Sequence, residues 1–157
     1  MGVLVVGFGN DLVADDGCGL AVVRRLSSTE GLRVAEGHSD SLLLPRLWAG
    51  EDQVWLVDAL VRGAPPGTVH RLTHEELLAV PQRHGTAHQL SLPESLRWVA
   101  LAYPDMAAVR YRLWGIEPAR LDLEEGLSPE VADAVVAVAD EIRHEGIPKG
   151  PLARALA

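Results

Sequence analysis

Cysteine is nearly absent from this sequence, since Cys18 is the only one among 157 residues. This excludes an internal disulfide and a multi-cysteine zinc site, and it favours a reducing compartment, so a cytoplasmic location is expected. Without a histidine motif beside it, Cys18 is predicted to be a small buried residue. Basic residues are also few, 14 against 22 acidic ones, and the net charge of -8 disfavours nucleic acid and anionic membranes as partners. No apolar run approaches the ~20 residues of a membrane span and no basic signal segment opens the chain, so we expect no membrane insertion.

The residues that are present alternate between strand and helix patterns. Short apolar runs predict strands near residues 3–6, 32–36, 53–58, 68–72 and 109–115, with helical spacing between them and after Ser128-Pro129. Thr73-His74-Glu75-Glu76 has the form of a capping box, which predicts a short helix after Thr73. The connection from 58 to 68 is too short for a helical crossover, which predicts an antiparallel edge strand at 68–72. This pattern is typical of an α/β protein, a three-layer α/β/α sandwich with a mostly parallel, about five-stranded sheet. We expect one domain over residues 1–145 and a mobile tail over 146–157.

The first predicted strand, loop and helix carry an unusual turn. Gly7 and Gly9 allow a sharp bend after the strand, and Asp15 and Asp16 stand where the helix should begin. Gly-x-Gly also opens dinucleotide sites, but Leu12 replaces the third glycine and two carboxylates would repel a pyrophosphate. A metal or other cation suits the two acids better, although one acid alone would also serve as a helix cap.

Two further candidate ligands follow along the chain. Asp58 ends the third predicted strand, and His88 lies just before a helix that opens with the capping box Ser91-Leu92-Pro93-Glu94. Ligands of open α/β sheets bind beyond the carboxyl ends of the strands. If this helix packs back across the sheet, Asp16, Asp58 and His88 converge there, and two carboxylates with an imidazole form a metal-binding set.

Three sequence signatures agree in order and spacing with one protease family. The first is Gly7-Phe8-Gly9-Asn10 with Leu12 and Asp15-Asp16-Gly17-Cys18-Gly19, the second is Val57-Asp58-Ala59 with Gly63 and Pro66-Gly67-Thr68, and the third is Thr86-Ala87-His88-Gln89-Leu90-Ser91-Leu92. Two later segments also match, Trp114-Gly115-Ile116-Glu117-Pro118 and Gly126-Leu127-Ser128-Pro129-Glu130-Val131. Over nearly its whole length the chain resembles the hydrogenase maturation endopeptidases, which trim the large subunit of nickel-iron hydrogenases.

The resemblance implies a five-stranded sheet between helices and a peptidase that removes the C-terminal extension of a nickel-iron hydrogenase large-subunit precursor. It carries the family's metal contacts onto Asp16, Asp58 and His88, which are then the expected catalytic and metal-contacting residues. The metal is nickel already held by the precursor, so no tightly bound cofactor of the enzyme's own is expected. Asp15 is a candidate for orienting a ligand or a helix end, and Asp15→Asn is expected to affect processing less than Asp16→Asn.

Several alternatives stay open at this level. A hydrolase with its own zinc and a non-catalytic module that senses nickel loading are two of them. Where the family commonly has a Gly-Thr pair, this chain has Glu36-Gly37-His38-Ser39-Asp40, which bears on the choice of hydrogenase partner. His38 is the next candidate ligand after His88. His38, Ser39 and Asp40 also have the residue types of a hydrolytic triad, but neighbours in sequence usually point apart. The sequence does not fix the oligomeric state, and a monomer is the expectation.

Overall fold

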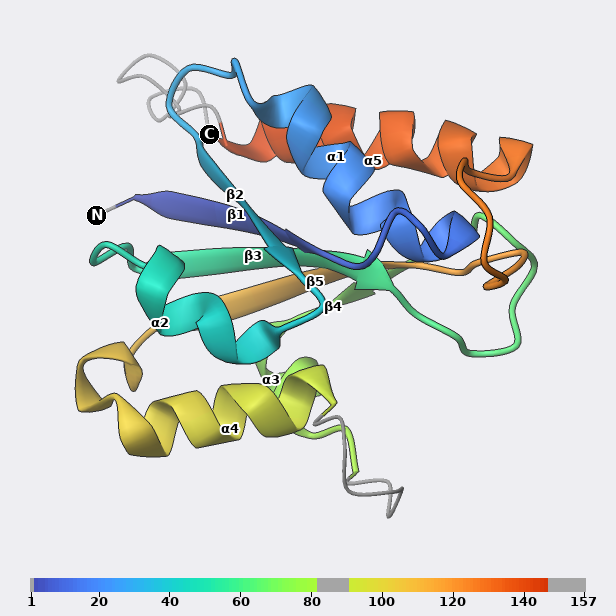
Figure 1. Cartoon of the computed structure of the whole chain (residues 1–157). Helices are drawn as coiled ribbons and strands as arrows, with labels where there is room; N and C mark the ends of the chain where they lie inside the picture. The colour runs from blue at the N-terminus through green and yellow to red at the C-terminus, as the bar shows by residue number, and fades with distance from the viewer. Residues whose placement is uncertain (1, 82–90, 147–157) are drawn as a thin grey trace.

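The computed structural model describes residues 2–81 and 91–146, which form a sheet between two layers of helices (Figure 1). The sheet has five strands in the order β2-β1-β3-β5-β4. Their bounds are β1 (Val3–Phe8), β2 (Arg33–His38), β3 (Gln53–Ala59), β4 (Val69–Leu72) and β5 (Arg110–Ile116). All neighbouring pairs are parallel except β4 and β5, and β4 lies at the edge. The predicted antiparallel edge strand and the mostly parallel sheet are therefore confirmed.

Helices cover both faces of the sheet, so the three-layer class is also confirmed (Figure 1). One layer holds α1 (Cys18–Leu26) and α5 (Pro129–Gly146), and the other holds α2 (Leu44–Leu47), α3 (His74–Leu78) and α4 (Leu92–Ala102). Short 3-10 turns are η1 (Ala14–Gly17), η2 (Ser41–Leu43) and η3 (Pro104–Met106). As predicted, the side chains of Thr73 and Ser91 accept backbone N–H groups where α3 and α4 begin. None of the helices in the described ranges is long and apolar enough to cross a membrane.

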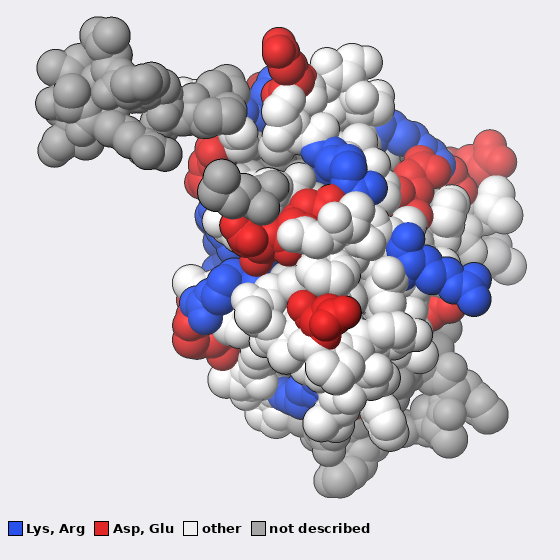
Figure 2. Space-filling view, turned by 90° about the vertical axis from the view of Figure 1, so that its left-hand side faces the viewer, with Lys and Arg blue, Asp and Glu red and all other residues white. Residues whose placement is uncertain are grey.

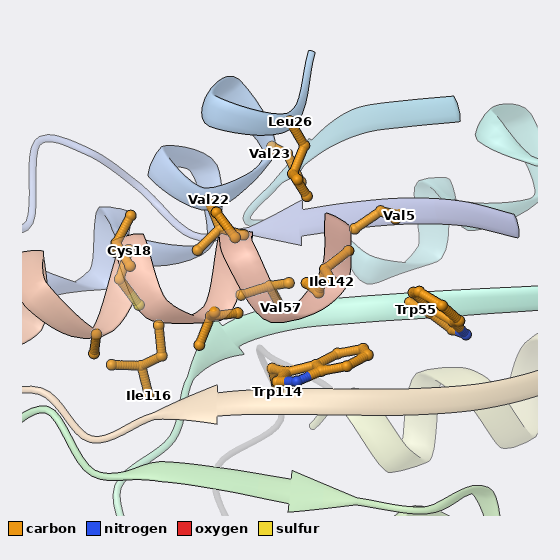
Figure 3. Close-up of a cluster of buried hydrophobic side chains, with 14 of the residues drawn as sticks. Val5, Cys18, Val22, Val23, Leu26, Trp55, Val57, Trp114, Ile116 and Ile142 are labelled. Carbon is orange, nitrogen blue, oxygen red and sulfur yellow. The ribbon is translucent and has the colours of Figure 1, made fainter. Parts of the chain in front are cut away.

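Alternating side chains of the strands fill two separate cores, because successive residues of a strand point to opposite faces. Val5, Trp55 and Trp114 pack beneath α1 and α5 (Figure 3), whereas Leu56 belongs to the core beneath α2, α3 and α4. Asp58 lies two residues after Leu56 and so leaves β3 on the face covered by α4.

Cys18 is fully buried in the first core, as the sequence predicts (Figure 3). Burial, followed by the negative charges of Asp58 and Asp16, raises the pKa of the Cys18 thiol. The thiol is therefore an inert packing group at neutral pH.

Acidic and basic side chains are interspersed at the end of the molecule where the parallel strands begin. Figure 2 shows this side, which is the left-hand side of Figure 1, with blue and red side chains next to one another. Ion pairs here include Arg33 with Glu51 and Arg110 with Glu75. The Arg110–Glu75 pair is exposed and contributes little stability, whereas Glu51 of the other pair is buried. No single sign of charge dominates this face.

Candidate functional site

At the end of the sheet where the parallel strands finish, the connections that leave β1 and β3 run in different directions. β1 lies between β2 and β3, and it connects to β2 through α1, while β3 continues toward β4 and the helices of the other layer. Beyond the carboxyl ends of β1 and β3 a crevice is therefore expected, and open α/β sheets bind their ligands at such points. Asp16, in η1, and Asp58, near the end of β3, both come from the segments that border this crevice.

Two glycines of the first motif allow the loop after β1 to approach the sheet closely. Gly9 has a φ of 134°, and a Cβ atom there would lie 1.9 Å from the carbonyl oxygen of Asp16. A Cβ atom at Gly19 would lie 2.4 Å from the carbonyl oxygen of Val57, the residue before Asp58. Larger residues at these positions would push η1 and α1 away from the strand ends, so the glycines bring the two acids into proximity.

The two acids share one hollow, which we call the acid pocket. Its volume is about 270 Å³, and its lining includes Asp16, Asp58, His38, Ser39 and Ser91. The Oδ2 atom of Asp16 accepts the N–H of residue 10 at 2.9 Å, and Oδ1 of Asp58 accepts the N–H of residue 59 at 2.8 Å. Within the described part of the chain, the second oxygen of each carboxylate accepts no hydrogen bond, which leaves it available to a ligand in the pocket.

The environment of Asp58 makes its negative charge unfavourable. Burial, followed by the nearby charge of Asp16, raises the pKa of Asp58 to about 7, and the hydrogen bond from Ala59 offsets only part of this rise. A bound cation would favour the ionised form of Asp58 and relieve the repulsion between the two carboxylates. The acid pocket is therefore suited to a positively charged ligand.

Of the three residues predicted to contact metal, Asp16 and Asp58 lie together in the acid pocket. His88 is outside the described residues, so its place in the predicted set stays a prediction. Within residues 2–81 and 91–146, no three His, Cys, Asp or Glu side chains form a group able to hold a metal ion. Two of the three residues predicted to contact metal therefore line the acid pocket, and the third lies outside the described residues.

The segment at the end of β2 reaches the same pocket without forming a hydrolytic triad. His38 and Ser39 line the pocket, and His38 has a φ of 51° where its carbonyl oxygen accepts the N–H of Gly9. The carboxylate of Asp40 instead accepts the N–H of Leu42 and caps η2. With Asp40 used in this way, the alternative of a His38-Ser39-Asp40 triad has no support in the geometry.

Asp15 has a different role from its neighbour Asp16. It is fully buried, and its carboxylate accepts the N–H groups of Ala119 at 2.8 Å, Arg120 at 3.1 Å and Ser128 at 2.7 Å, together with the Ser128 hydroxyl at 2.8 Å. Ser128 directly precedes α5, so Asp15 fixes the entry to that helix. Neither acid caps α1, because its first turn has no side-chain cap hydrogen bond.

We expect Asp15→Asn to lower the free energy of unfolding at pH 7 by about 3 kcal/mol, since an amide leaves buried N–H donors facing an NH₂ group. Burial alone would raise the pKa of Asp15, but the hydrogen bonds from Ser128, Arg120 and Ala119 outweigh it and lower the pKa. The contribution of Asp15 is therefore present above its unfolded-state pKa of about 3.9 and is lost as pH falls through the lower folded-state value.

Urea denaturation at pH 7 and below pH 4 measures this effect, with Asp11→Asn as the matched control. Asp11 is exposed and pairs with Arg24, so its replacement should change stability by no more than about 0.5 kcal/mol. Equal stabilities of the two variants at pH 7 would mean that Asp15 does not fix the loop before α5. The structure thus moves the expected effect of Asp15→Asn from processing to stability.

Glu117 is a buried acid beside the loop that follows Asp58, and the sequence did not reveal its role. It follows β5, is 2% exposed, and accepts the N–H groups of Arg62 and Ala64 at 2.8 Å. These bonds hold the loop that follows Asp58. The sequence did contain a signal for Glu117, namely an acid directly after an apolar strand. The same signal identified Asp58.

Comparisons with known proteins identify the family of this chain. The family model described as hydrogenase maturation protease matches residues 21–145. The hydrogenase 2 maturation protease of Escherichia coli is 29% identical over 161 residues, covering 95% of this chain and 97% of that protein. A putative hydrogenase maturation protease of Methanocaldococcus jannaschii is 30% identical over 138 residues, covering 85% of this chain and 88% of that protein.

Solved structures give the same family and the same fold. The [NiFe] hydrogenase maturation protease HybD of Thermococcus kodakarensis matches with a TM-score of 0.79 and 27% identity, over 93% of this chain and 99% of that chain. The hydrogenase maturating endopeptidase HybD of E. coli matches with a TM-score of 0.72 and 28% identity, over 93% and 94%. The family model covers most of this sequence, and the similarity extends over nearly the full length of these relatives. This chain therefore belongs to the hydrogenase maturation proteases and is an enzyme of that family.

Proposed function

We propose that the protein is a cytoplasmic endopeptidase that removes the C-terminal extension of a nickel-iron hydrogenase large-subunit precursor after nickel insertion. Asp16, Asp58 and His88 contact the nickel carried by the precursor, and the enzyme holds no tightly bound metal of its own. The reaction adds water to the scissile carbonyl and breaks the peptide C–N bond, giving a new C-terminal carboxylate on the mature subunit and an amine on the released peptide.

One observation carries this proposal, namely that Asp16, in η1 after β1, and Asp58, near the end of β3, line one pocket. Carboxylate oxygen and imidazole nitrogen are both ligands that nickel accepts. Asp16 and Asp58 are close enough for their charges to repel each other, and a divalent cation between them would relieve this repulsion. An ion there would activate the scissile carbonyl or a bound water as a Lewis acid.

The proposed role of His88 depends on its imidazole, so a substitution that removes the imidazole should slow processing. Gln keeps a polar side chain of similar reach but offers an amide, which is a poor nickel ligand, so His88→Gln should slow processing at least about 100-fold. Densitometry of precursor and product with time measures the rate. His84→Gln is the matched control and should process at the wild-type rate. Equal rates for the two variants would remove His88 from the site and make His38 the next residue to test.

Direct incubation with substrate tests the proposed activity. The enzyme is first treated with a chelator and desalted, and then mixed with nickel-loaded precursor. Mass spectrometry should detect a released C-terminal peptide and a correspondingly shortened large subunit. Loss of activity after chelation that zinc alone restores would instead support a hydrolase with its own zinc. A stable complex without cleavage would support a nickel-sensing binding module.

A further inference from the structure

A second hollow lies directly beside the acid pocket. It has a volume of about 540 Å³ and shares Asp58, Ser91 and Leu92 with the acid pocket. We call this second hollow the apolar groove. Because the two hollows share Asp58, a polypeptide that crosses the acid pocket can place its neighbouring side chains in the groove.

The described lining of the apolar groove is mainly hydrophobic. It is formed by side chains from the loop after β3, from β4 and β5, and from the region of α3, including Leu60, Val61, Leu72, Leu77, Val80 and Leu113. Asp58 and Arg62 are the charged residues among the described lining. Concave sites of this composition bind apolar groups, with a few polar atoms fixing the orientation.

Hydrogen bonds fix both walls of the groove before any ligand arrives. On one wall, Glu117 accepts the N–H of Arg62 at 2.8 and 3.0 Å, and the N–H of Leu60 donates to the carbonyl oxygen of Ile116 at 2.9 Å. On the other wall, the Arg97 guanidinium donates to the carbonyl oxygen of residue 78 at 2.6 Å and to that of Val80 at 2.8 Å. A pre-formed groove loses little conformational entropy on binding, which favours affinity.

We propose that the apolar groove binds apolar side chains of the substrate polypeptide next to the scissile bond. This inference rests on the proposed function, because it places the scissile bond at the acid pocket. An extended chain advances about 3.3 Å per residue, so residues one to three positions from the scissile bond reach a hollow that adjoins Asp58. Burial of those side chains releases water from both surfaces, so the groove selects substrates by the hydrophobicity of this segment.

Substitution at the groove's rim tests the proposal with the precursor as substrate. Val61 is 61% exposed, so Val61→Asp should fold normally while placing a charge in the groove. We expect the KM for nickel-loaded precursor to rise at least about 10-fold with little change in kcat, because the groove contributes binding remote from the reacting bond. Val136→Asp is the matched control, since Val136 is 39% exposed on α5, across the sheet, and should leave KM unchanged. Equal KM values for the two variants would overturn the proposal.

A binding measurement separates the groove from the cleavage reaction. Val61→Cys is labelled with a polarity-sensitive, thiol-reactive fluorophore. Cys18 does not react with the label, because its thiol is buried and has a raised pKa. The probes are blocked peptides that copy the residues on each side of the precursor's cleavage point, and matched peptides with Ser at every apolar position. A saturable blue shift of the emission with a native-sequence peptide, and not with its serine counterpart, supports binding in the groove. It also identifies which side of the cleavage point binds there. An unchanged emission, or equal shifts with the serine peptides, overturns it, whether or not the precursor is processed.

Discussion

Asp58→Asn and Asp16→Asn should each slow processing of nickel-loaded precursor by at least about 1,000-fold, because each removes one of two negative charges that face the acid pocket. The amide keeps the shape of the side chain and an oxygen that can accept the N–H of residue 59 or residue 10. Rates of precursor cleavage under single-turnover conditions measure the effect. A variant that keeps more than a tenth of the wild-type rate would exclude its residue from the reaction.

A measurement of stability provides the control for misfolding. We expect Asp58→Asn to lower the rate of processing but to raise the free energy of unfolding above pH 7. The folded-state pKa of about 7 lies above the unfolded-state value of about 3.9, so the folded protein binds this proton more tightly. Wild-type stability therefore falls as pH rises between these values, and the cost is fully present above pH 7. Asn carries no charge, so the variant should be more stable than wild type at pH 8 by roughly 2 kcal/mol, after allowance for partial solvent exposure.

At pH 5 the same comparison should give roughly a third of that difference, since the unfolded-state carboxyl is then already largely ionised while Asp58 is still protonated in the folded state. Urea denaturation at both pH values provides the two free energies of unfolding. A variant that is inactive and also less stable at pH 8 would mean that Asp58 supports the fold. An inactive variant that is more stable at pH 8 identifies an acid held at a cost to stability, as is common at functional sites.

Consecutive acids in one motif perform separate tasks in this structure. Asp15 is buried and surrounded by donors from Ala119, Arg120 and Ser128, and it joins the start of α1 to the entry of α5. Asp16 accepts one backbone N–H and faces the pocket. Because the first acid holds the turn in place, the second can remain largely unsatisfied at the mouth of the crevice. The pair thus couples the rigidity of the fold to the position of the carboxylate that faces the pocket.

Local patterns in the sequence predicted the elements that depend on local chemistry. The Thr73 capping box begins α3 as expected, and the short connection before β4 correctly indicated an antiparallel edge strand. Asp58 was found because a carboxylate directly ended an apolar run, and the strand-end rule placed it beside Asp16. These features involve short sequence separations or a general rule of α/β topology, so one sequence suffices to predict them.

Other features depend on partners far apart in the chain. The Asp15 carboxylate meets the N–H of Ser128, 113 residues later, in a loop without periodicity, and no spacing rule could have paired them. The bond from Arg62 to Glu117 spans 55 residues in the same way. The apolar groove arises only when α3, α4 and the loop after β3 meet. Tertiary contacts of this kind carry no short-range signal, which is why the sequence predicted the acids and missed the groove beside them.

Nickel in the precursor should be required for cleavage, and this is the second large effect that we expect. The acid pocket offers two carboxylates, with His88 as the proposed third contact, and borrowing the substrate's ion would make cleavage depend on completed metal insertion. Without the ion, the charges of Asp16 and Asp58 repel each other and no Lewis acid lies beside the scissile bond. Metal-free precursor should therefore be cut at least about 100-fold more slowly than loaded precursor.

The most direct measurement compares two samples of one precursor, nickel-loaded and metal-free, with metal contents verified by elemental analysis, each mixed with the same chelator-treated enzyme. The released C-terminal peptide is quantified by mass spectrometry over time. We predict complete release from the loaded sample, release at least about 100-fold slower from the metal-free sample, and recovery of the fast rate when nickel is inserted into the latter. Equal release from both samples would contradict the account, because the acids would then act without the substrate's nickel.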